Sequence, residues 1–279
     1  LRVVGDEVAI QKQFNIDSIY FWEQIDSFKK KALEARNRRV RPGKDTKMIA
    51  GWNGLLLTGF CDAYEATGNL KYFELAEENA HFLSSSLLSK GKLMRFPDKE
   101  MEGFLEDYAA VIQAFINFYE VSFKTEYLLN AQALMARVNE VFYDSTENLY
   151  YFTADDNNLI ARKKEFFDNV IPSSNSIMAW NLVHLGTHFY DDMMVNRGKS
   201  ILAQTKNLIL QEPEYLCNWA NLSLELSQPF AEIVIIGKEY KEFADAINLQ
   251  YLPNKIISGS LKETNKIPLL KVRPIITGN

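Results

Sequence analysis

The chain alternates between helices that are apolar on almost every side and helices that are apolar on one side. Residues 107–121, DYAAVIQAFINFYEV, contain only Asp107, Gln113, Asn117 and Glu120 as polar positions. That pattern indicates a helix surrounded by protein. Residues 124–141 instead carry a single apolar stripe opposite charged positions, which is typical of an outer helix. The same pair of patterns occupies 52–66 and 69–88, separated by a turn at Gly68.

These pairs recur at a fixed interval. A shift of 55 residues superposes Tyr64 on Tyr119 and Glu65 on Glu120, and a looser third copy occupies 175–188 and 191–209. Fixed-period helical pairs predict stacked hairpins. Because buried and one-sided helices alternate, the predicted fold class is all-α, an incomplete α/α toroid with inner and outer rings. Two further helices, near 17–38 and 214–227, bring the predicted total to about four inner and four outer helices. The inner helices should bury the side chains of Ala109, Ala110, Ala114, Leu56 and Phe60.

Two regions depart from the helical pattern. The connection 142–170 contains NLYYFTADDNNLIARKKE, two alternating runs around a polar turn, which predicts a β-hairpin. Near the end, a buried strand at 231–237, a helix at 239–248 and a strand at 255–258 predict a small β-α-β segment. It lacks a Gly-rich phosphate loop, which argues against a dinucleotide-binding fold. The expected organisation is a hairpin portion, 1–230, with the segment 231–279 packed on it.

Composition and charge narrow the possible partners. The formal net charge of −5 disfavours nucleic-acid binding, which needs an excess of Lys and Arg. No apolar run reaches the roughly 18 residues of a membrane span. Cys61 and Cys217 lie far apart in apolar stretches and are expected to be buried free thiols, as in a reducing cytoplasm. No metal or cofactor motif is visible. The chain starts without Met, which suggests an internal start.

Polar loops precede the predicted inner helices. They read RPGKDTKMIAGWNG, EGFLEDYA and FFDNVIPSSNS. In a toroid these helix starts share one face, where free N–H groups and partial positive charge suit carboxylates, hydroxyls and bound sugars or anions. Trp52 and Tyr108 offer stacking surfaces there. We call these helix starts the rim.

Three motifs in order resemble one known family. RxRRxRPxxDxKxxxxWNGL, FLEDYA and DNVIPSSNS are similar to motifs of the YyaL and spermatogenesis-associated protein 20 family of thioredoxin-domain-containing proteins. The resemblance implies a helical part like six-hairpin glycosidases and N-acylglucosamine 2-epimerases. The family's thioredoxin-like domain and first hairpins have no counterpart here, and its cysteine-containing end is missing. The chain therefore resembles the C-terminal half of a longer protein, and the redox activity of the missing domain is not expected of it.

The rim residues have both structural and functional interpretations. Glu106 and Asp107 could divide acid and base roles, as in glycoside hydrolysis, or could cap a helix and pair with Arg. Asp45 and Asp168 are further candidate acids or members of a salt-bridge network. No His lies near the rim motifs, which argues against a Ser nucleophile and weakens an epimerase interpretation. The predicted substrate-binding residues are Trp52, Asn53, Tyr108, Ser174, Asn175 and Arg41, the last within a basic cluster of Arg36, Arg38, Arg39 and Arg41.

Two classes of function remain open. One is a carbohydrate-active or sugar-binding domain, and the other is a non-catalytic scaffold that serves the missing thioredoxin-like domain. Fold resemblance alone cannot decide between them, because one scaffold hosts many chemistries. A ring of only four inner helices leaves an open seam, so self-association or coverage by the C-terminal segment is expected.

Overall fold

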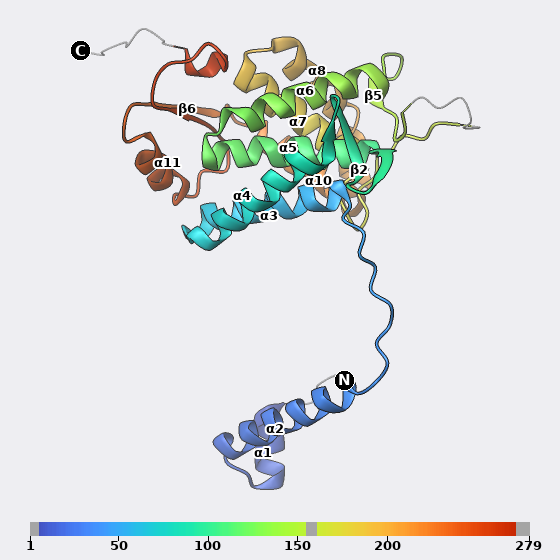
Figure 1. The fold of residues 1–279 in the computed structure, drawn as a ribbon, viewed down its shortest axis with the longest axis vertical. Helices are drawn as coiled ribbons and strands as arrows, with labels where there is room; N and C mark the ends of the chain where they lie inside the picture. The colour runs from blue at the N-terminus through green and yellow to red at the C-terminus, as the bar shows by residue number, and fades with distance from the viewer. Residues whose placement is uncertain (1–5, 155–160, 272–279) are drawn as a thin grey trace. The chain divides into compact units, whose positions relative to one another are not determined.

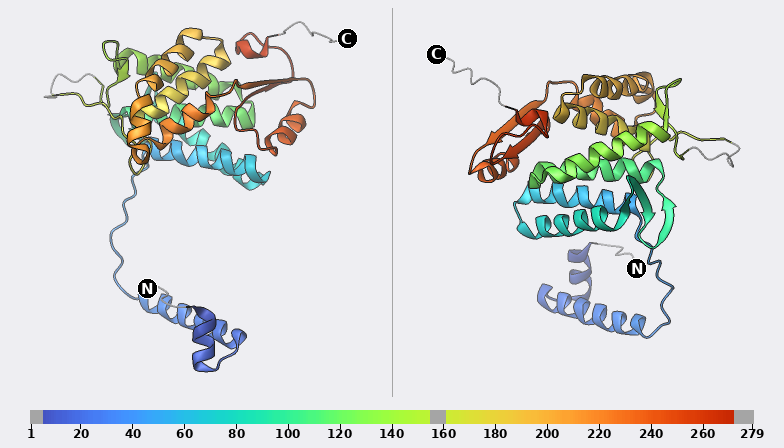
Figure 2. Two further views of the ribbon diagram at one scale, coloured as in Figure 1. Left: turned by 180° about the vertical axis from the view of Figure 1, so that it is seen from behind. Right: turned by 45° about the horizontal axis from the view of Figure 1, so that its top comes forward.

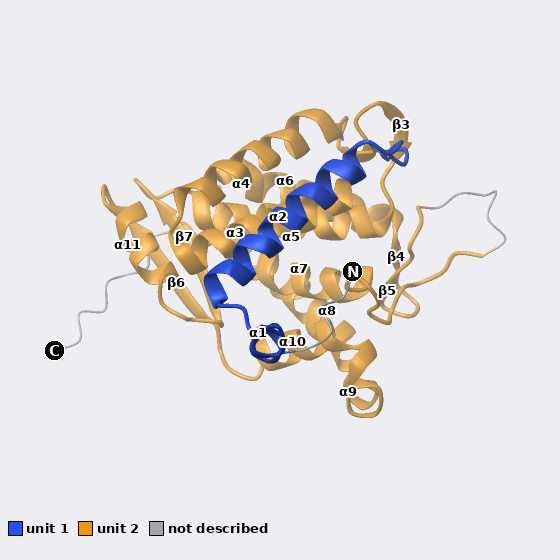
Figure 3. Cartoon of the chain, turned by 90° about the horizontal axis from the view of Figure 1, so that it is seen from below, with its two compact units in different colours: residues 1–46 blue, residues 47–279 orange. Residues whose placement is uncertain are grey.

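A computed structural model describes residues 6–154 and 161–271, which divide into two compact units, 1–46 and 47–279 (Figure 3). The first unit contains α1 (Glu7–Phe14) and α2 (Ser18–Asn37), the latter close to the predicted 17–38. Asp17 caps α2 by accepting a hydrogen bond from the backbone N–H of Tyr20. The second unit contains everything that follows.

Helical hairpins in two layers form the second unit (Figures 1 and 2). The inner helices α3 (Ala50–Thr67), α5 (Leu105–Ser122) and α7 (Ser174–Phe189) lie side by side in that order. The outer helices α4 (Leu70–Phe82), α6 (Thr125–Val141) and α8 (Asp192–Ala203) each pack on the inner helix that precedes them. The prediction of stacked helical hairpins is confirmed.

Each hairpin turns through a left-handed residue directly after its inner helix. These residues are Gly68, Phe123 and Tyr190, with φ of 64°, 57° and 52°. Glycine also permits a close crossing of α3 and α5, because a Cβ on Gly54 would lie 2.7 Å from the carbonyl carbon of Ala110. The short turns and the close crossing hold the inner helices nearly in register, so residues at equivalent helix positions face one another.

Burial differs between the inner helices. The central helix α5 is the most enclosed, and Ala109, Ala110 and Ala114 are buried as predicted. The prediction was wrong for Leu56, which is 49% exposed, and Phe60 is only partly buried. Helix α3 packs on α5 and α4 through its other faces, and Leu56 lies on the face that these two helices leave uncovered. The apolar composition of α3 therefore overstated its burial.

Short strands connect the hairpins. After a π-helical turn, η1 (Leu83–Leu87), the antiparallel strands β1 (Leu88–Ser89), β2 (Lys92–Phe96) and β3 (Lys99–Glu102) lead into α5; the sequence analysis did not predict them. In the 142–170 connection, β4 (Tyr143–Asp144) pairs with β5 (Leu149–Tyr150). This hairpin turns earlier than predicted. The predicted polar turn lies mainly outside the described residues, although its flanks meet where the backbone N–H of Phe152 donates to the carbonyl of Lys163.

The C-terminal part supplies one more inner helix and the small β-α-β segment. Helix α9 (Lys206–Gln211) and the turn η2 (Pro213–Tyr215) precede α10 (Cys217–Glu225), which lies beside α7. Strands β6 (Ala231–Ile236) and β7 (Lys255–Ser260) are parallel and joined by α11 (Tyr240–Asn248), as predicted, and η3 (Pro268–Leu270) follows. The prediction that the first strand is buried was wrong: among the described strands β6 pairs only with β7, and Val234 and Ile236 are exposed. This segment packs on α3, α5 and α7.

Both cysteines are free thiols, but only one is buried. Cys61 on α3 is 2% exposed. The prediction of a buried thiol was wrong for Cys217, which is exposed at the start of α10. Its Sγ atom lies 3.4 Å from the carbonyl oxygen of Pro213, outside the core cluster. The apolar residues of α10 that do reach the core are Trp219 and Leu222.

Candidate functional site

Glu106 and Asp107, the leading rim candidates, share one cation. The guanidinium group of Arg95 on β2 contacts Oε1 of Glu106 at 2.8 Å and Oδ2 of Asp107 at 2.5 Å. Pairing with an Arg was predicted, but Arg95 was not identified as that partner because the β2 strand was not predicted. The two carboxylates are thus held together at the start of α5.

Asp107 links the starts of two inner helices. Its Oδ2 accepts from the backbone N–H of Phe104, and its Oδ1 accepts from the backbone N–H of Gly51 in the first turn of α3, both at 2.9 Å. The predicted cap of α5 is confirmed, and the bond to α3 is additional. The side chain is fully buried, which raises its pKa; Arg95 and the two N–H groups act in the opposite direction.

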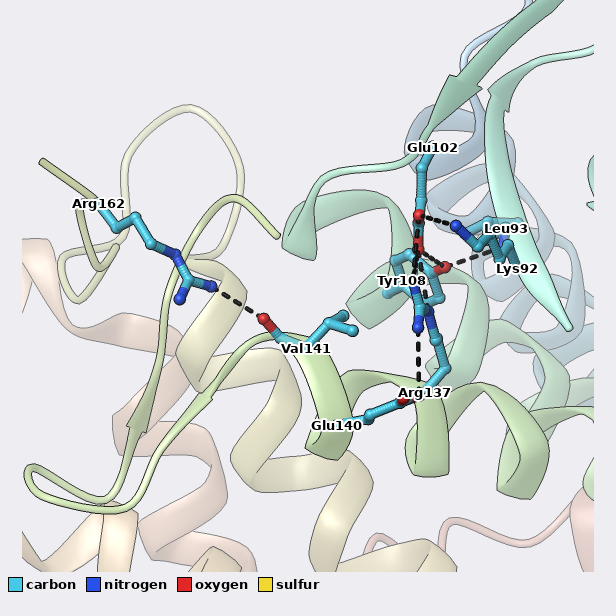
Figure 4. Close-up of polar contacts among 8 residues, drawn as sticks. All are labelled: Lys92, Leu93, Glu102, Tyr108, Arg137, Glu140, Val141 and Arg162. Carbon is cyan, nitrogen blue, oxygen red and sulfur yellow. Dashed lines mark hydrogen bonds and ion pairs between the residues drawn. The ribbon is translucent and has the colours of Figure 1, made fainter. Parts of the chain in front are cut away.

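Tyr108 does not present a stacking surface to solvent. Its ring is fully buried, and its hydroxyl donates to Glu102 and accepts from the backbone N–H of Leu93, both at 3.0 Å (Figure 4). Glu102 also receives hydrogen bonds from Lys92 and Arg137. Burial raises the pKa of Tyr108 above its ordinary value and Glu102 acts in the same direction, whereas the Leu93 N–H and Arg137 oppose the change. Tyr108 therefore joins β2 and β3 to α5.

The third rim motif is held by an internal hydrogen-bond network. Asp168 accepts from the backbone N–H groups of Ser173 and Asn218, both at 2.8 Å, so it connects the starts of α7 and α10, and no Arg among the described residues pairs with it. Asn175 is fully buried. Its side-chain oxygen accepts from the backbone N–H of Tyr150, and its side-chain NH₂ donates to the backbone carbonyl of Tyr150. The hydroxyl of Ser174 donates to Glu165.

The remaining predicted residues are more open. Trp52 is 63% exposed beside a recess of about 10 Å³ that Glu106 and Pro172 also line, so the starts of α3, α5 and α7 do meet at one end of the layer. Asn53 donates to the carbonyl of Ile49. Arg41 and Asp45 belong to the first unit, where Arg41 is exposed and bonds Asn37. A recess of this volume holds about one water molecule, and a catalytic role of the rim stays a prediction.

A much larger cavity lies further along the same helices. It has a volume of about 390 Å³ and is lined by side chains from the second halves of α3 and α5, the middle of α7, α10, and the loop that leads into β7. All of these belong to the second unit. We call this cavity the inner-helix pocket. Its lining residues are Cys61, Asp62, Glu65, Asn117, Glu120, Trp180, His184, Asn221, Leu224, Glu225, Tyr251, Pro253, Asn254 and Lys255.

An aromatic pair forms one wall of the pocket. The rings of Trp180 and His184, one turn apart on α7, stack with centroids 3.6 Å apart and an interplanar angle of 17°. The Nε2 atom of His184 lies 2.7 Å from a carboxylate oxygen of Glu225 on α10. Its other ring nitrogen, Nδ1, is buried and has no hydrogen-bond partner among the described residues. A buried nitrogen without a partner is a position at which a ligand or water gains a hydrogen bond.

Two carboxyl groups on α3 face the same space. Loss of hydration raises the pKa of Asp62 and of Glu65, and the Lys255 ammonium opposes that change. Lys255 contacts Oε2 of Glu65 at 3.1 Å, whereas the Asp62 carboxylate accepts no hydrogen bond from the described residues. Carboxyl groups with raised pKa values in a cleft are candidates for proton transfer.

The sequence contained a signal for this pocket. Asn117 and Glu120 are polar positions late in an apolar helix, and the 55-residue shift already aligned Glu65 with Glu120. Polar residues at equivalent late positions of parallel inner helices must converge in space. The polar loops at the helix starts are more conspicuous in the sequence, so the site was predicted there and the pocket was not.

Comparison with known proteins identifies relatives in sequence. No protein-family description matches the chain. Human spermatogenesis-associated protein 20 is 28% identical over 265 residues, which cover 88% of this chain and 34% of the human protein. The chain is similar in sequence to spermatogenesis-associated protein 20 over most of its length. The rat protein is 29% identical over 81% of this chain, and an uncharacterised Caenorhabditis elegans protein is 33% identical over 58%. The predicted family resemblance is confirmed, and the chain spans about a third of the length of these mammalian relatives.

Some solved structures resemble part of the chain. A GH76 α-mannanase from Bacteroides thetaiotaomicron matches with a TM-score of 0.46 at 18% identity, covering 60% of this chain and 46% of that one. A cellobiose 2-epimerase from Bacillus thermoamylovorans matches with a TM-score of 0.47 at 16% identity, covering 58% and 45%. None of the described helices is long and apolar enough to cross a membrane.

Proposed function

We propose that the inner-helix pocket binds a carbohydrate and has the groups for acid–base chemistry on it. The observation that carries the proposal is the stacked Trp180–His184 wall facing the carboxyl groups of Asp62, Glu65 and Glu120. A volume of about 390 Å³ lies within the range of small-molecule sites, roughly 300–1,000 Å³. The proposal keeps the carbohydrate ligand expected from the sequence but moves it from the rim to the pocket.

The lining fits a neutral polyhydroxyl ligand better than an anion. Carboxylates accept hydrogen bonds from hydroxyl groups, and the side-chain amides of Asn117 and Asn221 both donate and accept. Neither amide makes a side-chain hydrogen bond within the described residues, so both are available. The indole of Trp180 supplies an apolar surface for the C–H face of a sugar ring. A phosphate or carboxylate ligand would be repelled by this acidic lining, in which the ammonium group of Lys255 is already paired with Glu65.

Proton transfer within the pocket has two kinds of participant. The raised pKa values of Asp62 and Glu65 favour a carboxyl group that holds its proton and acts as an acid. His184, with Nε2–H donated to Glu225, would present an unprotonated Nδ1 as the base. A carboxyl group and an imidazole in one site can divide the acid and base roles between them.

A matched pair of tryptophans tests the location. Thermal unfolding is followed with glucose, mannose, N-acetylglucosamine, cellobiose and maltose, because a ligand that binds the folded state raises the melting temperature. Trp180→Leu should abolish the shift that an active sugar produces, and Trp52→Leu at the rim should preserve it. The opposite result would move the site to the rim, and no shift with any sugar would count against the proposal.

A non-catalytic scaffold is the second candidate, and the rim contacts favour it. Asp107 and Glu106 are matched by Arg95 and by helix N–H groups, as a structural role requires. Under this proposal the domain serves the thioredoxin-like domain of a longer cytoplasmic protein. Glu106→Gln and Asp107→Asn in that protein separate the two roles. Lost stability with unchanged ligand binding means a scaffold, and lost activity in a stable protein means chemistry.

Self-association belongs to the same proposal. The face of α3 that carries Trp52 and Leu56 is exposed, and Leu224 on α10 is 73% exposed. Light scattering tests whether these faces pair two copies of the chain. A monomer at all concentrations would remove self-association from the proposal and leave the scaffold role to be decided by the rim variants.

A further inference from the structure

A buried chain of three side chains ends at the inner-helix pocket. The Oγ atom of Ser258 on β7 lies 3.2 Å from Nδ1 of His188, and Nε2 of His188 lies 2.9 Å from Oε1 of Glu120. Ser258 and His188 have no exposed surface, whereas Glu120 is 9% exposed and lines the pocket. The arrangement has the residue types of a hydrolytic triad. However, the Ser258 hydroxyl is fully buried, so no substrate can reach it.

Glu120 is the member of this chain that a ligand can contact. Its Oε1 is held by His188, and its Oε2 accepts no hydrogen bond from the described residues. The ring of Tyr119 packs edge-on against the His188 ring, with centroids 5.4 Å apart, so the imidazole is fixed on its face as well as at both nitrogens. A carboxylate that is anchored by one oxygen presents the other in a fixed direction.

We propose that His188 is a positioning residue for the pocket: it donates Nε2–H to Glu120 and so orients the second carboxylate oxygen toward the ligand. The Ser258 hydroxyl donates to Nδ1, which fixes the imidazole in the tautomer protonated at Nε2. The C-terminal segment thereby sets the geometry of an acid on α5 with which its described residues make no hydrogen bond. The role toward a sugar rests on the proposed function, and the orientation of Glu120 does not.

The first test reads the tautomer directly in the ligand-free protein. Histidine ¹⁵N resonances, assigned with the His188→Gln variant, should show a neutral ring protonated at Nε2. Ser258→Ala should weaken that tautomer preference, because Glu120 alone then holds the ring, and should lower the melting temperature, because the buried Nδ1 loses its donor. A ring protonated at Nδ1, or a tautomer mixture in the unmodified protein, would overturn the proposal whether or not any sugar binds.

The second test measures binding of the sugar that stabilises the unmodified protein. His188→Leu should weaken the sugar affinity at least tenfold, whereas His188→Gln, whose amide N–H can replace Nε2–H, should remain within about threefold. His81→Leu on the outer helix α4 is the matched control and should change nothing. Equal losses in the Leu and Gln variants would show that His188 acts only through packing, and the positioning role would fail.

A double-mutant cycle identifies the partner through which His188 acts. If His188 acts through Glu120, then His188→Leu should have no further effect on sugar affinity in a Glu120→Gln background. Additive losses would contradict the proposal. If no sugar binds to the unmodified protein, the proposed function fails while the tautomer measurement still decides how Glu120 is held.

Discussion

Replacing Asp107 tests how much the stability of the fold depends on the one buried carboxylate that joins the starts of α3 and α5. Asp107→Ala leaves the backbone N–H groups of Gly51 and Phe104 without acceptors and removes one of the two carboxylates that bind Arg95. Asp107→Asn does not restore the contacts. Both carboxylate oxygens accept from N–H groups, so one of these donors would face the new NH₂ group in either amide orientation.

The cost follows from the number and type of lost contacts. Leaving a buried donor unsatisfied costs about 1–3 kcal/mol, and breaking a buried charge pair costs about 3–5 kcal/mol. These energies do not add, because all of the lost contacts involve the single carboxylate of Asp107. In addition, Arg95 keeps its contact with Glu106 and is partly solvated. We expect Asp107→Ala to lower the free energy of unfolding by about 3–5 kcal/mol. For a protein of this size that corresponds to a melting temperature lower by roughly 6–20 °C.

Urea denaturation measures this directly, with Glu106→Ala as the matched control. Glu106 pairs with the same Arg95, but its side chain is 23% exposed, so its loss should cost about 0–1 kcal/mol. If Asp107→Ala lowers the free energy of unfolding by less than about 1 kcal/mol, or by no more than Glu106→Ala does, then the Asp107 bridge between the helix starts does not stabilise the fold.

Three further predictions concern the same unit. Gly54→Ala should destabilise the protein by about 1–3 kcal/mol in urea denaturation, because its Cβ would overlap the backbone of Ala110. Gly59→Ala on the same helix, with no atom within 4 Å of its Cβ, should stabilise it by roughly 0.5–1 kcal/mol. Burial alone would raise the pKa of Glu102, but its hydrogen bonds hold that pKa below its ordinary value of 4.5. The stability advantage of the unmodified protein over Glu102→Gln should therefore be complete above about pH 4.5 and disappear as the pH falls through the lowered pKa. In thiol labelling, native Cys217 should react at once and Cys61, whose pKa burial raises, only on unfolding.

The hairpin architecture could be predicted from the sequence because periodicity reports burial directly. Helix α5 has polar residues at only a few positions, and it lies within a few residues of its predicted bounds. Periodicity cannot report which faces of an end helix lack a neighbour, so Leu56 was assigned to the core. Strand β2 was missed because its residues, KLMRF, give only a short and weak alternation. That omission also concealed Arg95 and hence the partner of the rim carboxylates.

The candidate site was harder to predict for a different reason. The residues that line the pocket come from four helices and a distant loop, and each contributes one or two polar positions within a long apolar stretch. Read one helix at a time, Glu120 or His184 looks like an isolated exception in a buried helix. Only the register between helices, which the short hairpin turns set, shows that these exceptions face the same space. That register is a tertiary property.

The distance along the chain between the walls of the pocket has a consequence for protein synthesis. The hairpins are made of local contacts and can form one after another as the chain leaves the ribosome. The bonds that attach the C-terminal segment to α3 join residues far apart in the sequence: Lys255 reaches Glu65 at the pocket across 190 positions, and Asp245 reaches Tyr64 across 181. A nascent chain therefore exposes the acidic ends of α3 and α5 until β7 has been translated. A ribosome stalled before residue 255 should hold hairpins that are already protected from proteolysis around a pocket that lacks a wall.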